Sequence, residues 1–411
     1  MTLLIQNCRL ETGFNIVNQQ VVSTKTETYD VLITNGIICE IAKAIPTTPD
    51  MTLINAQEAL LLPALKEMHI HIDKTYFGGP WQACQPITNG IFTRFEEERT
   101  LLPNQLDTAY DRACKVLEHY IAQGHHHIRS HCNVDPYIGT KHIELTKRAF
   151  DTYRDYLTYE IVAFPQHGLL RSNVLPLMKE AMKMGASHVG GVDPSTVDRD
   201  VDRSLTTILD LAVEFEAGVD VHLHNRDSLG EYEFYKLADY TRQANKQNQV
   251  TISHGMALGD LSGEALTKMV DTLVATGIDV TTTVPINRPT MPIPQLVKDG
   301  LRVSLGHDSL TDHWSPFGTG NTIAKMNVLA QRFGLSDELR LSRIWQYGAG
   351  GLLPLDDFGQ QVWPYIGAPA DAVLVSAESS AHAIARQREI THTITKGICA
   401  YEQSNRIDQG E

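Results

Sequence analysis

The sequence has no apolar run of the roughly 18 to 20 residues that a membrane-spanning helix needs. Its opening stretch, MTLLIQNCRLETG, shows no basic segment followed by a long apolar one, so we expect no signal peptide. Cysteine is scarce as well, because the six Cys residues are scattered and none stands in a CxxC pair. A chain of 411 residues can bury a large core without disulfides. These absences predict a cytoplasmic protein.

Basic residues are also fewer than acidic ones. The chain carries 35 Lys and Arg against 49 Asp and Glu, for a net charge of −14. An acidic surface disfavours nucleic acid and anionic membranes, and we expect neither as a partner. Apolar residues make up 42% and charged residues 20%, an ordinary globular composition that leaves room for a small-molecule partner.

The two ends of the chain differ from its middle. Residues 1–60 read as short strands and turns, with Asn35-Gly36 as a hairpin signal between two apolar runs. Residues 370–377 and 390–402 are strand-like again. We therefore expect a small β-sandwich domain built from residues 1–60 and 356–411.

Between these ends, one junction recurs in which a helix closes on a glycine and a strand follows. Its spacing is one or two units of about 30 residues, the size of a βα repeat. The glycines are Gly124, Gly185, Gly218, Gly277 and Gly300. Eight such strands fit between residues 61 and 355, which predicts an α/β fold, a TIM-type (β/α)8 barrel. The alternative is an open doubly wound sheet, but no GxGxxG fingerprint follows the first strand.

Histidine is plentiful, with 17 residues, and it gathers at the expected strand ends. His69 and His71 close the first barrel strand and share a face, because strand side chains alternate. His222 and Asp308 close the fifth and eighth strands, and in such a barrel the carboxyl ends of the strands form the site. These four ligands suit a divalent ion with one position open for water. We expect zinc first, with ferrous iron as the alternative.

Two other features bear on the metal. The fourth expected strand, ASHVGGVD, ends without the Lys that commonly bridges two metals in such barrels, so one ion is expected. The tract His125–His127 stands at the start of the second strand, at the opposite end from the site. We therefore expect it to serve packing or surface roles.

Five segments appear in the order in which a known family carries them between residues 67 and 321: EMHIHIDKT, AFPQHG, VDVHLHN, ISHG and GHDSLTDHWSPFGTGN. The chain resembles the amidohydrolase superfamily, and within it the bacterial cytosine deaminase-like branch. The resemblance implies a mononuclear site at His69, His71, His222 and Asp308. It also implies that His254 stabilises the developing oxyanion, that Gln166 bonds a substrate amide edge and that Trp314 walls the pocket. Because relatives often assemble, a homo-oligomer is a further expectation.

One residue departs from that branch. Relatives that deaminate a ring carry a Glu three residues after the strand-5 His, where this chain has Asn225. An amide does not titrate near neutral pH, and a general acid–base group contributes typically about 10²–10⁴-fold in rate. If Asn225 occupies the shuttle position, Asn225→Glu is expected to create or raise ring-deaminating activity.

Three interpretations of this departure remain open. His224 or Asp227 supplies the proton; or the substrate needs no ring protonation and Asp308 handles both transfers; or the protein binds metal and ligand without turnover. We expect foremost a metal-dependent amidohydrolase that cleaves a non-peptide C–N bond (amide, cyclic amide or amidine) of a small nitrogen compound. The alternatives are a cytosine deaminase-like aminohydrolase of a pyrimidine or related N-heterocycle, and an inactive binding homologue. Asp308 and His254 are the expected catalytic residues, and the expected substrate contacts are Gln166, His224, Asn225 and Trp314.

Overall fold

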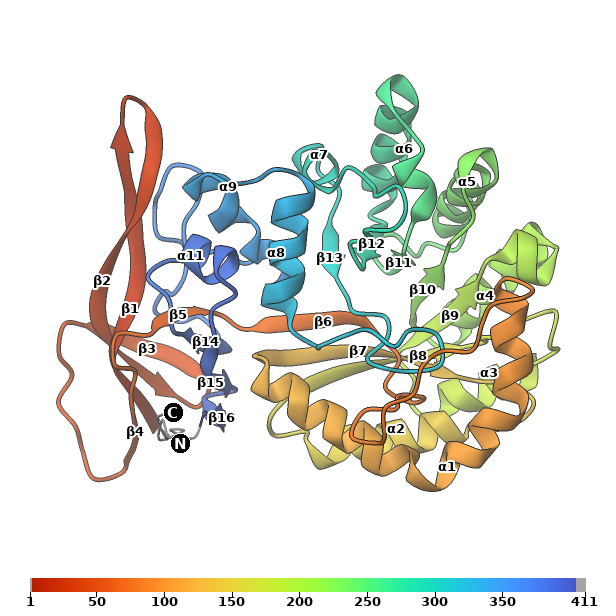
Figure 1. The fold of residues 1–411 in the computed structure, drawn as a ribbon, viewed down its shortest axis with the longest axis horizontal. Helices are drawn as coiled ribbons and strands as arrows, with labels where there is room; N and C mark the ends of the chain where they lie inside the picture. The colour runs from red at the N-terminus through yellow and green to blue at the C-terminus, as the bar shows by residue number, and fades with distance from the viewer. Residues whose placement is uncertain (1, 404–411) are drawn as a thin grey trace.

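The structure, a computed structural model, describes residues 2–403 and divides its strands between two sheets (Figure 1). One is a sheet of eight parallel strands that follow one another in chain order. Its strands are β6 (Leu65–Ile70), β7 (His125–Asn133), β8 (Thr158–Phe164), β9 (His188–Val192), β10 (Gly218–His222), β11 (Val250–Ser253), β12 (Asp279–Thr282) and β13 (Val303–Leu305). The chain after β13 returns to β6, where Asp308 N donates to His69 O at 2.7 Å and Ile70 forms a parallel bridge with Asp308. This contact closes the sheet and confirms the expected α/β barrel.

Helices connect successive barrel strands and cover the barrel from outside (Figure 1). They are α1 (Ile91–Ala122), α2 (Lys141–Thr152), α3 (Leu175–Lys183), α4 (Val201–Glu214), α5 (Asp227–Gln243), α6 (Gly263–Thr276) and α7 (Ile293–Lys298), and β13 is followed by α8 (Thr322–Arg332), α9 (Glu338–Arg343) and α10 (Trp345–Gly348). The predicted helix ends hold at Gly124, Gly185 and Gly277, which adopt φ of 86°, 102° and 64°. Such values favour glycine at a helix C-terminus. Within residues 2–403, no helix combines the length and apolar character needed to cross a membrane.

The second sheet takes strands from both ends of the chain. These are β1 (Thr2–Val17), β2 (Gln20–Thr34), β3 (Ile37–Ala42), β4 (Met51–Asn55), β5 (Leu60–Pro63), β14 (Ala372–Val375), β15 (Ile390–Thr395) and β16 (Ile398–Glu402), with α11 (Ser380–Ala385) between β14 and β15. Hydrogen bonds join all eight strands into one mixed sheet, and β1 contains three register shifts. The extended segment from Leu60 to Ile70 is divided at Ala64, because β5 pairs with β14 and β1 of the terminal sheet whereas β6 enters the barrel.

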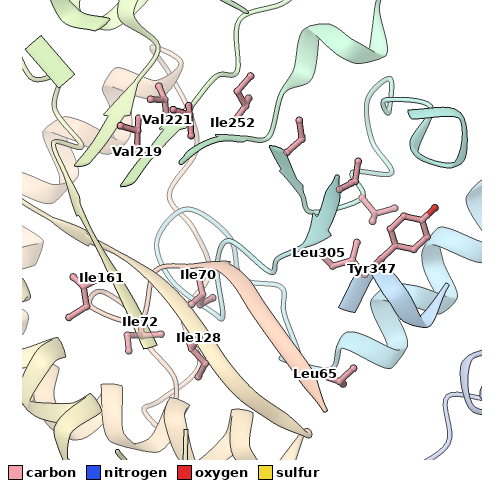
Figure 2. Packing of buried hydrophobic residues seen from close by; sticks show 14 of the residues in the cluster. Leu65, Ile70, Ile72, Ile128, Ile161, Val219, Val221, Ile252, Leu305 and Tyr347 are labelled. Atoms are coloured by element: carbon pink, nitrogen blue, oxygen red, sulfur yellow. The ribbon is translucent and has the colours of Figure 1, made fainter. Parts of the chain in front are cut away.

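Side-chain alternation along each barrel strand separates an apolar layer from a polar interior. In β10, Val219 and Val221 are fully buried in the large apolar cluster that includes residues of the surrounding helices. Figure 2 shows Ile70 and Ile72 of the first strand region in the same cluster. The intervening residues, such as Asp220, therefore face the barrel interior. The same alternation places the histidines of β6 and β10 inside the barrel.

Candidate active site and metal centre

Four side chains that are distant in sequence converge at the carboxyl ends of the barrel strands. His69, His71, His222 and Asp308 each offer one ligand atom, and these atoms lie within 4.8 Å of one another. Asp308 Oδ1 lies 3.2 Å from His69 Nε2 and 3.4 Å from His71 Nε2. His71 Nε2 lies 3.3 Å from His222 Nε2. We call these four residues the ligand cluster.

The chemistry of the ligand cluster fits one divalent cation. Burial lowers the pKa of His71 and holds that of His222 well below its usual range, so both imidazoles are neutral, which is the ligating form. Burial acts to raise the pKa of Asp308, but the neighbouring His254 and His69 hold it well below its ordinary value. Neutral nitrogen lone pairs and a carboxylate oxygen therefore face a common point. A cation there would satisfy all four groups.

A second group of potential ligands lies deeper in the barrel but does not suit a second ion. His69, His131 and Asp220 form this group, and it shares His69 with the ligand cluster. The guanidinium of Arg129 already pairs with the carboxylate of Asp220, with Nη1 donating to Oδ2 at 2.9 Å. A permanent positive charge at that distance opposes a cation. The residue that follows β9 is Asp193 and not Lys, so both observations support a single metal.

A small cavity opens beside the ligand cluster. It is lined by His71, Lys74, Ile91, Gln166, His222, His224, His254, Asp308, Ser309 and Trp314. The structure thus brings the expected contacts Gln166, His224 and Trp314 to the same cavity as the expected catalytic pair Asp308 and His254. It also adds Lys74, a residue that the sequence pattern did not single out.

Lys74 supplies a buried positive charge to the cavity wall. Its Nζ donates to Gln166 Oε1 at 2.7 Å and to Asn133 Oδ1 at 3.1 Å, and lies 3.5 Å from Glu98 Oε1. Burial acts to lower the pKa of Lys74, but nearby carboxylates, Glu98 first, raise it above its ordinary value. Because Gln166 accepts through Oε1, its Nε2 is left to donate. Lys74 therefore orients Gln166, whose Nε2 offers a donor to an oxygen of the substrate.

His224 and Asn225 lie next to each other but have different surroundings. Asp193 accepts from the His224 backbone N at 2.7 Å and contacts its Nδ1 at 2.9 Å, which leaves Nε2 for the cavity. Burial disfavours the charged imidazole, yet Asp193 raises the pKa of His224. Asn225 is absent from the cavity lining, and its Nδ2 donates to Ser195 Oγ at 2.9 Å and to Glu233 at 3.0 Å. The structure thus brings His224, but not Asn225, to the candidate site.

Three residues at this rim have a strained backbone. Asp193, His254 and Asp308 adopt φ of 37°, 69° and 65°, in the left-handed region that is uncommon for residues other than glycine. Each follows the end of a barrel strand. Strained residues of this kind persist where the surrounding structure fixes them, and they cluster at active sites. The strained residues are thus His254 and Asp308, which line the cavity, and Asp193, which holds His224.

Comparison with known proteins agrees with this geometry. Residues 52–397 match the sequence profile of the amidohydrolase family. The chain belongs to that family. It is similar to the uncharacterized protein YahJ of Escherichia coli strain K12, with 37% identity over 397 residues that cover 96% of this chain and 86% of that protein.

Two solved structures are similar over nearly the whole chain. The N-isopropylammelide isopropylaminohydrolase of Burkholderia multivorans superposes with a TM-score of 0.84 at 28% identity, covering 97% of each chain. The 5-methylcytosine deaminase of Klebsiella pneumoniae superposes with a TM-score of 0.77 at 26% identity, covering 98% of each chain. These matches confirm the expected amidohydrolase membership. The chain is a metal-dependent hydrolase of C–N bonds in small nitrogen compounds.

Proposed function

We propose that this enzyme is an aminohydrolase that removes an amino substituent from a small nitrogen heterocycle that also carries a carbonyl oxygen on the ring. The observation that carries the proposal is the His224–Asp193 pair. His224 lines the cavity, while its Nδ1 is held by Asp193 at 2.9 Å. An imidazole so anchored presents Nε2 to the substrate and can deliver a proton to a departing nitrogen. It therefore supplies the acid that Asn225 does not provide.

The other catalytic roles belong to the metal ion and to further residues of the cavity. A bound divalent ion supplies a Lewis acid that lowers the pKa of water from 15.7 toward about 7. Asp308 accepts the proton from the attacking water, since its carboxylate lies at the ligand cluster and stays ionised. His254, whose Nε2 lies 4.0 Å from Asp308 Oδ2, stabilises charge on the attacking water oxygen as it bonds to the ring carbon. His224 protonates the leaving nitrogen.

Other residues of the cavity lining fit the rest of a heterocycle. Gln166, oriented by Lys74, provides a donor for a carbonyl oxygen on the ring, and Trp314 and Ile91 provide apolar surface. The similar enzymes from Burkholderia and Klebsiella act on N-isopropylammelide and on 5-methylcytosine, which supports an amine leaving group. Amide or cyclic-amide hydrolysis, which our first expectation from the sequence included, needs no second acid, and the His224–Asp193 pair would then have no proton to deliver.

The proposed metal is zinc, with ferrous iron as the alternative, because both accept three imidazoles and one carboxylate. We infer a small-molecule substrate from the cavity and a cytoplasmic location from the scattered cysteines, none of which stands in a CxxC pair. The net charge of −14 disfavours a nucleic-acid or membrane partner. Light scattering on the purified protein distinguishes a monomer from a homo-oligomer.

The test offers zinc-loaded enzyme a panel of amino-substituted triazines and pyrimidines, cyclic amides and N-acyl compounds. Release of an amine or ammonia from an amino-substituted ring supports the proposal. Opening of a cyclic amide, or cleavage of an N-acyl compound to its acid and amine, would replace it with amide hydrolysis. Turnover of nothing by protein that carries one zinc per chain would favour a binding homologue.

Two variants locate the acid. We expect His224→Gln to lower kcat by about 10²–10⁴-fold, the usual contribution of a general acid. The matched control is Asn225→Gln at the adjacent residue, whose amide lies outside the cavity lining. Equal losses in both variants would refute the assignment of the acid to His224.

A further inference from the structure

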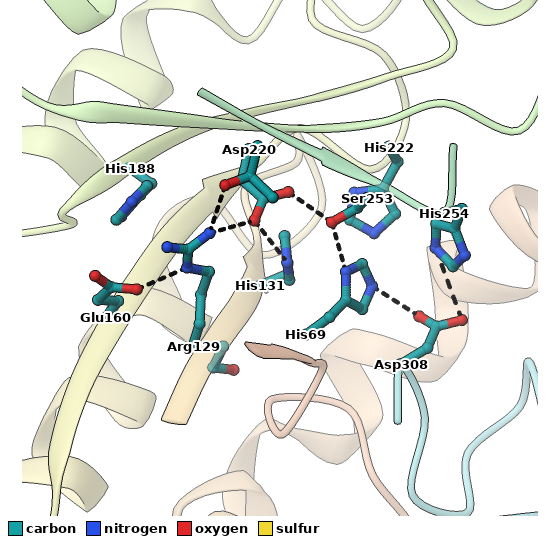
Figure 3. Close-up of polar contacts among 12 residues, drawn as sticks. His69, Arg129, His131, Glu160, His188, Asp220, His222, Ser253, His254 and Asp308 are labelled. Atoms are coloured by element: carbon teal, nitrogen blue, oxygen red, sulfur yellow. Dashed lines mark hydrogen bonds and ion pairs between the residues drawn. The ribbon is translucent and has the colours of Figure 1, made fainter. Parts of the chain in front are cut away.

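A line of hydrogen bonds runs from the ligand cluster into the barrel interior (Figure 3). His69 Nδ1 lies 2.6 Å from Ser253 Oγ, and Ser253 Oγ donates to Asp220 Oδ1 at 2.6 Å. The second oxygen of Asp220 accepts from Arg129 Nη1 at 2.9 Å. These residues come from β6, β11, β10 and β7, and all are buried.

The charges along this line fix the direction of each hydrogen bond. Arg129 is permanently cationic and bonds Asp220, which therefore acts as a carboxylate that only accepts. Ser253 has one hydroxyl proton, and it is donated to Asp220. Ser253 Oγ must then accept from His69, so the proton of that imidazole is on Nδ1. The lone pair of His69 consequently lies on Nε2, the nitrogen that is 3.2 Å from Asp308.

The other two histidines of the ligand cluster have no such support. Among the described residues, the Nδ1 atoms of His71 and His222 are buried and have no hydrogen-bond partner. Of the three imidazoles, His69 is thus the one whose tautomer and ring orientation are set by another side chain. This difference singles out the Ser253–Asp220 pair from the general polar packing of the barrel.

We propose that Ser253 and Asp220 are positioning residues that prepare His69 to bind the metal. Asp220 acts on His69 through the Ser253 hydroxyl, in the way that a carboxylate behind a metal-bound histidine fixes its tautomer and raises its basicity. Arg129 pairs with Asp220 at 2.9 Å, and Arg129 is itself held by Glu160 Oε2 at 2.6 Å and Thr251 Oγ1 at 2.9 Å. The inference rests on the metal site of the proposed function, and it adds that Ser253 and Asp220 increase the affinity of that site for the metal.

The experiment measures Zn²⁺ affinity by competition with a chromophoric chelator. We expect Ser253→Ala to weaken affinity by about 10–100-fold, the usual effect of losing such a partner. The matched control is Ser204→Ala, because Ser204 is also buried and its Oγ also donates to an Asp, Asp198, at 2.6 Å, but outside the cavity lining. The control should change affinity by less than about threefold. Ser253→Thr keeps the hydroxyl and should stay close to the wild type.

The results distinguish failure of the metal site from failure of the hydrogen-bond relay behind it, by which we mean the path from His69 through Ser253 to Asp220. If the wild type binds no zinc, the metal site and the relay both fail. If the wild type binds zinc and Ser253→Ala binds it equally well, the relay alone fails. Equal weakening in Ser204→Ala, or in Ser253→Thr, would also overturn it, because packing would then set the affinity and not the hydroxyl. Selective loss in Ser253→Ala supports it.

Discussion

Glu98 is the buried centre of the polar network behind the cavity, and its removal should be costly. It lies on α1, is fully buried, and gathers donors from segments that are far apart in the chain. The donors are His167 Nε2 at 2.8 Å, His313 Nε2 at 2.8 Å, Trp314 Nε1 at 2.9 Å, Asn133 Nδ2 at 3.2 Å and Lys74 Nζ at 3.5 Å. Burial acts to raise the pKa of Glu98, but Lys74 and the two histidines hold it well below its usual range. The carboxylate is therefore ionised.

The variant Glu98→Gln keeps the shape of the side chain and removes its charge. One amide oxygen still accepts, but the amide NH2 then faces the donors that surrounded the other oxygen. Lys74 also loses its nearest carboxylate while it stays buried. Removing one partner of a buried ion pair costs about 3–5 kcal/mol. We expect a loss of this size in the free energy of unfolding, together with lower turnover because Lys74 lines the cavity.

Urea unfolding followed by tryptophan fluorescence measures this loss. The matched control is Glu96→Gln on the same helix, where Glu96 forms an exposed pair with Arg99. Exposed pairs contribute about 0–1 kcal/mol, so this variant should remain near the wild type. If Glu98→Gln unfolded at the same urea concentration as Glu96→Gln, the reasoning about the buried network would be refuted.

Three further changes test other parts of the molecule. Burial raises the pKa of Glu11 from 4.5 to about 7, so the folded protein keeps a proton that the unfolded chain releases, and stability falls as the pH rises from 4.5 to 7. The free energy of unfolding, measured at pH 5 and pH 8, should therefore decrease less in Glu11→Gln than in the wild type. At Gly306 a Cβ would lie 2.5 Å from the Cβ of His69, so Gly306→Ala should lower zinc content measured by elemental analysis. Asn225→Glu would bring a second carboxylate to Glu233, 3.0 Å from the present amide, so calorimetry should show destabilisation and deaminase assays should show no gain.

The barrel could be predicted because its signals are local. A helix that ends on a glycine and is followed by an apolar strand is visible within a short window of sequence, and Gly277, for example, adopts the positive φ that this pattern requires. The division of the extended segment from Leu60 to Ile70 is different. It depends on the pairing of Leu61 with Leu374, more than 300 positions later in the chain. Pro63 interrupts the apolar run from Leu60 to Leu65, but the run does not show that its two parts belong to different sheets.

The site residues also differ in whether a local sequence signal predicts them. Glu98 could not be predicted because it comes from a helix and acquires its role only through contacts with distant loops. His224, in contrast, could have been preferred over Asn225. Side chains alternate in an extended chain, so His222 and His224 share a face and Asn225 turns away from it. The structure has this arrangement, since His224 lines the cavity while Asn225 bonds Glu233 behind it. The missing Glu is thus weak evidence against amine release, because the alternation already places an imidazole where a proton donor is needed.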